Sequence, residues 1–396
     1  MLAPTRSAPS YTVYRMPRFQ APDGRDGWGW RRVRRILFAA ALISLVPALV
    51  SFASAMTQPS NSSFFINAVE WLRDNGARGL VNTIENEYYT LTAPAKGGPA
   101  LKKLTRQKGA LASAPAVHHV RVHFYRPPNI VPLTHGLPGE GVWRPTYADG
   151  GSRPPVLITQ FRPEPFVYPQ VVVGVAWIDH THTSVQLYPG LQEPSVPMLS
   201  RGPEEVPMSM RSRLVATFNS GFKLADSGGG FVWRHHTYAP LQNGLATIVR
   251  YADGSVNVIR WEGGPYAPPN VVWARQNLPL IVNGGRPNPD LNNSAQWGAT
   301  LGNQALVWRS AVGVDRHGNL LYVAGPDQGL SSLATTMIHA GAVRAMEMDI
   351  NTYWTSLITY RYPGAHDPAN LLSSMDRSPL RYLTPDDRDF FAVYLH

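Results

Sequence analysis

The chain of 396 residues contains no cysteine, which excludes a disulfide framework, thiol catalysis and thiolate zinc sites. Charged residues are scarce, at 16% against 44% hydrophobic residues, and this balance excludes disorder of the whole chain. Glycine and proline together make up about 18% of the residues, which favours strands and loops over long helical bundles. The length suits two or three domains, or one large sheet-rich domain with appendages.

Positive charge is concentrated at the N-terminus. Residues 1–35 hold eight arginines and two aspartates, so they carry +6 of the formal net charge of +10. The rest of the chain has only a small excess of basic residues. The sequence therefore predicts a basic cytoplasmic tail over residues 1–35 and argues against nucleic acid as a partner.

An apolar segment follows this tail. Residues 36–56 include no charged side chain and are long enough to cross a hydrocarbon core of about 30 Å as a helix. The four arginines at positions 31–35 predict a cytoplasmic N-terminus and an extracytoplasmic main domain. We expect a single-pass anchor in the cell membrane. A cleaved signal peptide is the alternative, because Ala53-Ser54-Ala55 resembles a cleavage site.

Three further regions differ in composition. Residues 57–115 place apolar side chains at helical spacing and predict a helical stalk, whereas residues 116–170 are rich in proline and predict a connector. Residues 171–396 consist mostly of short runs of β-branched and aromatic residues. We predict an α+β domain there, with a large mixed or antiparallel sheet and few helices.

Particular strands, two hairpins and one helix can be predicted within this pattern. Strand-like runs begin at about Val156, before the predicted domain boundary. Hairpins are predicted around Tyr251–Gly254 and Asp315–Asn319, because short Asp- and Gly-containing turns separate apolar runs at both places. A helix is predicted over Leu330–Ala342, followed by a strand over Val343–Ile350.

Motifs of common hydrolases and nucleotide-binding proteins are missing, including the G-x-S-x-G elbow, the H-E-x-x-H helix and the P-loop. Polar groups instead follow several predicted strands. These groups are Asn219-Ser220-Gly221-Phe222, Asn283-Gly284-Gly285-Arg286, Arg309-Ser310 and Glu347-Met348-Asp349-Ile350-Asn351. Each group taken singly is typical of a turn. Four such groups on strands of one sheet predict a common cleft.

The order of these motifs, from about Leu214 to Tyr360, resembles the phosphodiester glycosidase domain, the family of N-acetylglucosamine-1-phosphodiester alpha-N-acetylglucosaminidase. The resemblance continues through Ala311–Asp315, Gly318–Leu321 and Gly341–Val343. Segments near Val69–Gly76 and Ile84–Asn86 also resemble membrane-anchored actinobacterial members. Many members continue with a glycine-rich D-G-G-G-S turn, whereas Ile350 and Asn351 follow Asp349 here. Bulkier residues are expected to reshape the site at this turn.

The resemblance implies roles for particular side chains. Asp349 is the expected catalytic carboxylate and Arg309 the expected phosphate clamp, with Glu347 as a second carboxylate because spacing by two on a strand predicts a shared face. The residues expected to bind substrate are Asn219, Gly221, Asn283, Gly284, Gly285, Arg286 and Asn351. Two other interpretations stay open: Arg309 as the ion-pair partner of Asp349, and Glu347 as a solvent-facing residue.

The resemblance therefore implies an extracytoplasmic, membrane-anchored hydrolase of glycosyl phosphodiesters in the cell envelope. The alternative is a catalytically inactive surface module of the same fold that binds wall glycan or a protein partner. The expected partners are a sugar phosphodiester or envelope glycan, and the membrane through the N-terminal helix. No cofactor or dedicated metal site is predicted, although a divalent cation near Asp349, or near His180 and His182, remains open.

Overall fold

The computed structural model describes residues 26–111, 125–149, 153–292, 297 and 306–396. The chain forms two compact units, Met1–Gln58 and Pro59–His396. Most of the predicted basic tail, as well as parts of the predicted stalk and connector, lie outside the described residues. The two units are therefore considered separately.

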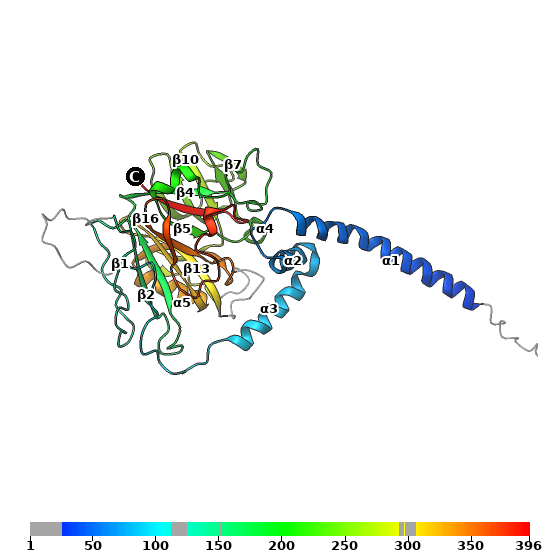
Figure 1. The fold of residues 1–396 in the computed structure, drawn as a ribbon, viewed down its shortest axis with the longest axis horizontal. Helices are drawn as coiled ribbons and strands as arrows, with labels where there is room; N and C mark the ends of the chain where they lie inside the picture. Colours follow the sequence, from blue (N-terminus) through cyan, green and yellow to red (C-terminus); the bar gives the residue numbers. More distant parts are fainter. Residues whose placement is uncertain (1–25, 112–124, 150–152, 293–296, 298–305) are drawn as a thin grey trace, which may run out of the picture. The chain divides into compact units, whose positions relative to one another are not determined.

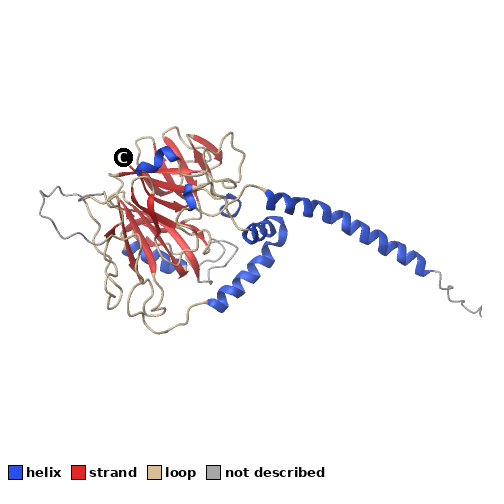
Figure 2. Cartoon of the chain, in the orientation of Figure 1, coloured by secondary structure: helices blue, strands red, loops and turns tan. Residues whose placement is uncertain are grey.

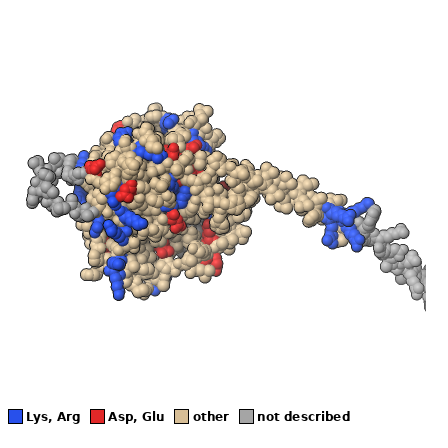
Figure 3. All heavy atoms as spheres, in the orientation of Figure 1, with Lys and Arg blue, Asp and Glu red and all other residues tan. Residues whose placement is uncertain are grey.

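The first unit contains helix α1 (Asp26–Thr57), which includes Pro47. Its segment Gly29–Thr57 is long and apolar enough to cross a membrane, and no part of the segment's most apolar window is buried. Figure 3 shows basic side chains gathered at the N-terminal end of this helix and none along the rest of it. The predicted apolar helix is confirmed, whereas the membrane and the orientation stay predictions.

The second unit begins with two helices, α2 (Phe64–Leu72) and α3 (Arg78–Thr92). The Ser63 side chain accepts a hydrogen bond from the Ile66 backbone N–H and caps the first of these helices. An irregular turn at Arg73–Ala77 separates α2 from α3. Gly76 has φ +92° in this turn, a conformation that glycine adopts without strain.

An eight-stranded sheet forms the larger part of this unit, and its strand order is β1-β2-β3-β14-β13-β15-β11-β12. All of its pairings are antiparallel. The strands are β1 (Arg144–Pro145), β2 (Val156–Phe161), β3 (Val173–Ile178), β11 (Leu280–Asn283), β12 (Arg286–Pro287), β13 (Val307–Asp315), β14 (Leu320–Gln328) and β15 (Ala342–Ile350).

Two five-stranded antiparallel sheets complete the fold. The order β17-β16-β5-β18-β4 makes the first, which we call the β5 sheet, and β7-β6-β10-β8-β9 makes the second. Their strands are β4 (Thr183–Tyr188), β5 (Leu214–Asn219), β6 (Phe231–Trp233), β7 (His236–Ala239), β8 (Ala246–Tyr251), β9 (Val256–Arg260), β10 (Val271–Gln276), β16 (Leu357–Tyr362), β17 (His366–Asn370) and β18 (Phe390–Leu395). Short helical turns lie at α4 (Leu224–Ser227), Met208–Arg213 and Arg381–Leu383.

The eight-stranded sheet is covered on both faces (Figures 1 and 2). Helix α5 (Leu330–His339) packs on one face, in a buried cluster that includes Ala311 and Ala345. The neighbouring residues Val312 and Met346 belong to a second cluster, which they share with residues of the two smaller sheets. Side chains alternate between the two faces of a strand, so this central sheet is buried on both sides.

The predicted α+β class, with large antiparallel sheets and few helices, is confirmed. The hairpins predicted around residues 251–254 and 315–319 are also present, as β8–β9 and β13–β14. Strands β1 and β2 come from the segment predicted as a connector, and they extend the sheet of the predicted domain.

Candidate active site

The ends of β5 and β15 meet through a chain of hydrogen bonds. The Asn219 amide donates to Ser310 Oγ at 3.1 Å, and Ser310 Oγ donates to the Asp349 carbonyl at 2.7 Å. Asn219 Oδ1 accepts from the Tyr322 hydroxyl at 2.6 Å and from the Ser356 backbone N–H at 3.0 Å. The structure therefore brings together three of the four predicted motifs. The Asn219 amide also donates to the Ser220 carbonyl at 2.8 Å, so its hydrogen-bonding groups are all engaged within the protein.

An irregularity in β15 shapes this end of the strand. The register between β13 and β15 shifts between Arg309 and Ala311, which pair with Ile350 and Glu347 respectively. This bulge places an extra residue of β15 opposite Ser310. The Asn277 amide donates to the carbonyls of Glu347 and Met348 that the bulge frees, at 2.8 and 3.1 Å.

The bulge also corrects the prediction that Glu347 and Asp349 share a face. Spacing by two gives a shared face only in a regular strand, and an inserted residue interrupts this alternation. The two carboxylates have different partners: Glu347 pairs with Arg309, whereas Asp349 faces Arg388.

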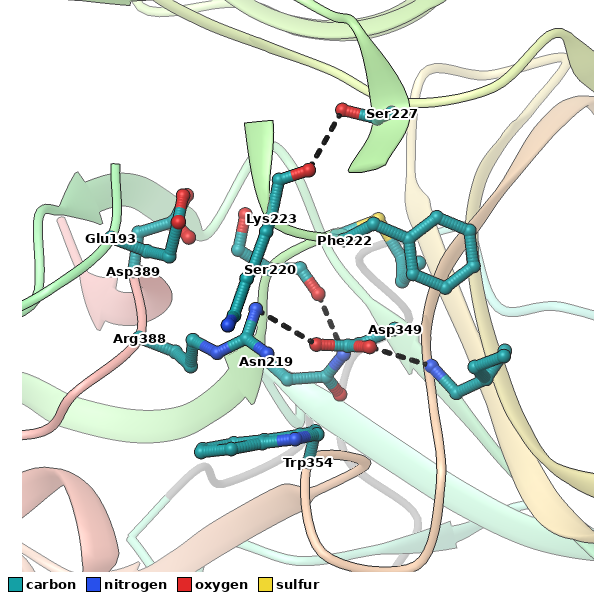
Figure 4. A network of polar contacts seen from close by, with 12 residues as sticks. Glu193, Asn219, Ser220, Phe222, Lys223, Ser227, Asp349, Trp354, Arg388 and Asp389 are labelled. Atoms are coloured by element: carbon teal, nitrogen blue, oxygen red, sulfur yellow. Dashed lines mark hydrogen bonds and ion pairs between the residues drawn. The ribbon is translucent and has the colours of Figure 1, made fainter. Parts of the chain in front are cut away.

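Asp349 is buried, with 6% of the residue exposed. Its carboxyl group points towards Arg388 (Figure 4). Its Oδ1 accepts a hydrogen bond from the Ile350 backbone N–H at 2.9 Å, and its Oδ2 lies 3.7 Å from Arg388 Nη1. Burial raises the pKa of Asp349 to about 7, although the positive charge of Arg388 acts in the opposite direction. This carboxyl group can therefore exchange a proton near neutral pH.

Arg388 is held from several sides. Its guanidinium lies over the Trp354 ring, 4.3 Å from the ring centroid, which orients the guanidinium plane (Figure 4). Its Nη2 lies 3.7 Å from the Oε2 of Glu70, a residue of α2. Lys223 forms a close ion pair with the same Glu70 oxygen. Two cations therefore share the Glu70 carboxylate, and one of them, Arg388, also faces Asp349.

Arg309 and Glu347 form a separate buried pair. Arg309 Nη1 lies 2.5 Å from Glu347 Oε1, and Arg309 Nε donates to the Gln328 carbonyl at 2.9 Å. Burial raises the pKa of Glu347, and the charge of Arg309 offsets part of that effect. The interpretation of Glu347 as solvent-facing is wrong, because its exposed fraction is 0%. The ion-pair partner of Arg309 is Glu347, and the cation that faces Asp349 is Arg388.

The Asn283–Arg286 group lies elsewhere. Asn283 ends β11, and Gly284 and Gly285, with φ of +60° and +71°, form the turn into β12. Glycine is favoured at both positions of such a hairpin turn. Asn283 pairs with Arg344, near the beginning of β15, whereas Asp349 is near its end. The prediction that this group shares a cleft with Asp349 is therefore not met, because its residues close an exposed hairpin.

Gly221 lies where the chain leaves β5 and passes Asn277. A Cβ atom at Gly221 would lie 3.1 Å from Asn277 Cγ, so glycine permits this close approach. Ser220 Oγ and Asn277 Oδ1 are buried and have no hydrogen-bond partner among the residues that the structure describes. Buried polar atoms are normally paired, so two unsatisfied oxygens this close to Asp349 are unusual.

Asn351 stands in the turn where many members of the resembling family have glycine. Its φ is +87°, in the left-handed region that asparagine tolerates better than most residues. Its Oδ1 accepts a hydrogen bond from the Tyr353 backbone N–H at 2.9 Å. The turn therefore keeps a glycine-like backbone at Asn351, whose side chain stabilises the turn itself.

No metal-ligand cluster is present in the described part of the chain. Three or more His, Asp or Glu side chains do not come together there in a way that would hold an ion. His180 lies beside Gly318, at the β13–β14 turn. The divalent cation left open at Asp349 thus finds no ligand set among these residues.

Sequence reasoning missed three residues of this site: Lys223, Asn277 and Arg388. Lys223 directly follows the Asn219–Phe222 motif, and this adjacency could have identified it as a site residue. Arg388 lies between acidic residues in a loop some forty residues from Asp349, and no local pattern links the two. Asn277 acts through the bulge, which is a property of the folded sheet.

No protein-family model and no curated protein matches the chain. Solved structures with a distant likeness include the catalytic domain of zebrafish N-acetylglucosamine-1-phosphodiester alpha-N-acetylglucosaminidase, at 16% identity and a TM-score of 0.40, covering 63% of this chain and 86% of that one. A hypothetical protein from Synechocystis has 15% identity and a TM-score of 0.34, with 57% and 59% covered. A putative exported protein from Burkholderia pseudomallei has 11% identity and a TM-score of 0.25, with 62% and 75% covered. The chain thus spans under two thirds of the Synechocystis protein.

Proposed function

We propose that this protein hydrolyses glycosyl phosphodiesters, with Asp349 as the reacting carboxyl group. The observation that carries the proposal is the position of Asp349: it is buried at the end of β15, faces Arg388, and has a pKa raised to about 7. A general base works best when its pKa lies near the working pH. An ordinary exposed aspartate, with a pKa of about 3.9, would be a weaker base by roughly three pKa units.

In the proposed reaction, the bond between the anomeric carbon and the phosphate oxygen breaks. Its electron pair leaves with the phosphate, and the oxygen of a water molecule bonds to the anomeric carbon. The Asp349 carboxylate takes the proton that this water gives up, so the products are a free sugar and a phosphate monoester. Glycosidic cleavage ordinarily uses two carboxyl groups, but phosphate leaves with little protonation, so one carboxyl group suffices here.

Other residues support this role without reacting. Asn219 positions Asp349 through Ser310, and Gly221 permits the close approach of Asn277. The unpaired buried oxygens of Ser220 and Asn277 are suited to accept hydrogen bonds from sugar hydroxyls. We assign the Asn283–Arg286 turn no part in this chemistry.

We further propose that α1 anchors the protein in the cell membrane, with the second unit in the extracytoplasmic space. The length and apolar composition of the helix and the arginines at its N-terminal end support this orientation. The substrate would then be a sugar phosphodiester or a phosphodiester-linked glycan of the cell envelope.

The test is a hydrolysis assay on the full-length protein in detergent, with a panel of sugar-1-phosphodiesters. Asp349→Asn should lower turnover by about 10²- to 10⁴-fold, the usual contribution of a general base. Asp253→Asn is the matched control, because Asp253 lies in the exposed β8–β9 turn of another sheet and should keep full turnover. Full turnover in Asp349→Asn would contradict the assignment. Sugar-phosphate binding without turnover in the wild type would favour the inactive surface module.

A further inference from the structure

The cation that faces Asp349, Arg388, shares an anion with Lys223. Lys223 Nζ and Arg388 Nη2 converge on a single atom, the Oε2 of Glu70. All three side chains are largely buried, with exposed fractions between 10% and 15%. Glu70 belongs to α2, so this anion comes from the helical segment that precedes the sheets in the chain.

We propose that Lys223 and Arg388 form a phosphate-binding subsite next to Asp349, and that the Glu70 carboxylate occupies this subsite until a phosphate group displaces it. The inference rests on the proposed function, because it names the groups that would recognise the substrate phosphate. It also gives α2 a regulatory role at the site, since substrate must exchange with Glu70.

The chemistry of the two cations fits a phosphate group. Arginine presents a planar fork of donors to phosphate oxygens, and lysine adds a point charge. Arg388 Nη1 lies 3.7 Å from Asp349 and has no hydrogen-bond partner among the described residues, so a donor remains for a phosphate oxygen. A phosphate in place of the Glu70 carboxylate would therefore lie beside the proposed base.

The other acidic groups near Arg388 are committed elsewhere. Asp389 forms an ion pair with Arg275 at 2.8 Å, and Glu193 Oε2 accepts hydrogen bonds from the backbone N–H groups of Ser195 and Leu224. Burial disfavours the charged form of Glu70, but Arg388 and Lys223 outweigh that effect and hold its pKa below the ordinary value. Glu70 is thus a charged carboxylate whose main partners are the two cations.

The contacts that hold α2 are compatible with the exchange of the Glu70 carboxylate for a phosphate group. None of the nine residues of α2, all of them described, is fully buried. Nearby polar contacts hold the segment, including the ion pairs of Asp74 with Lys223 at 3.2 Å and of Arg78 with Asp226. Partly exposed ion pairs of this kind contribute little to stability, so these two pairs oppose the release of Glu70 only weakly.

The test measures binding of inorganic phosphate to the full-length protein in detergent by isothermal titration calorimetry. Glu70→Gln removes the competing charge with little change in shape, and it should bind phosphate at least tenfold more tightly than the wild type. Glu87→Gln is the matched control, because Glu87 is an exposed acid on α3, and its affinity should equal that of the wild type. Adding Lys223→Met to Glu70→Gln should abolish the gain.

Equal affinity in folded Glu70→Gln and the wild type would overturn the proposal. Glu70→Ala provides a second variant with the same expectation if Glu70→Gln does not fold. The outcome is separable from that of the hydrolysis assay. Tighter phosphate binding without turnover on any sugar phosphodiester supports the subsite and contradicts the hydrolase. Turnover lost in Asp349→Asn without any change in phosphate affinity in Glu70→Gln supports the hydrolase and contradicts the subsite.

Discussion

Strand β15 carries two buried carboxylates with different surroundings: Glu347 lies on the α5 side of the sheet, and Asp349 lies at the end of the strand. On the α5 side, Glu347 and Arg309 form a 2.5 Å ion pair inside a closed core. At the end of the strand, Asp349 lies 3.7 Å from Arg388, a cation that also contacts Glu70. A short, closed pair mainly maintains structure, whereas a loosely paired carboxyl group can change its protonation. The difference shows that partners and burial, rather than spacing along a strand, decide what each acid does.

Arg309→Met tests the structural role of the Glu347–Arg309 ion pair. We expect it to have the largest effect on stability. Removing one partner of a buried ion pair leaves the other charge uncompensated, which costs about 3–5 kcal/mol. The free energy of unfolding of the full-length protein in detergent, from chemical denaturation, measures this cost.

The double variant Arg309→Met/Glu347→Met serves as the control, because it removes both charges. It should regain most of the lost stability, since no unpaired buried charge remains. An Arg309→Met protein as stable as the wild type would show that the pair has no structural role, and the comparison would then fail.

The pH dependence of the free energy of unfolding tests the second part of the comparison, the buried carboxyl group of Asp349. Burial raises the pKa of folded Asp349 from its ordinary value to about 7, so the folded state binds more protons than the unfolded state between about pH 4 and 7. Stability relative to Asp349→Asn should therefore fall as the pH rises through this range and level off above pH 7. The raised pKa corresponds to a loss of about 4 kcal/mol at most.

Unfolding of the wild type and Asp349→Asn, measured side by side from pH 4 to 8, isolates this contribution, because the other carboxyl groups are common to both proteins. A constant difference across the range would mean that Asp349 titrates normally, and the contrast with Glu347 would lose its basis.

Much of the fold follows from local sequence patterns. The run Val156–Phe161 and the turn at Asp253-Gly254 predict elements that the structure contains, because strand alternation and turn chemistry are local properties. β18 was not predicted, although Phe390–Leu395 is a short apolar run at the C-terminal end of the chain. Its assignment depends on pairing with β4 and β5, more than 150 residues earlier.

The candidate site was predictable only in part. Asn219 and Asp349 end buried strands, and the structure connects them through Ser310. The Asn283–Arg286 turn has a similar local pattern, yet it closes a hairpin at the other end of β15. The position of Arg388 beside Asp349 could not be predicted from the sequence, because a loop distant in the chain brings it there. Sequence spacing identifies strand ends, whereas the sheet order decides which of them meet.

The most direct test of the account is the pH dependence of kcat/KM for one hydrolysed sugar-1-phosphodiester, measured on the full-length protein. A base must be deprotonated to act, so kcat/KM should rise with pH and reach a plateau, with a midpoint near the pKa of about 7 raised by burial of Asp349. A profile that is flat from pH 5 to 9, or that falls through pH 7, would contradict Asp349 as the base.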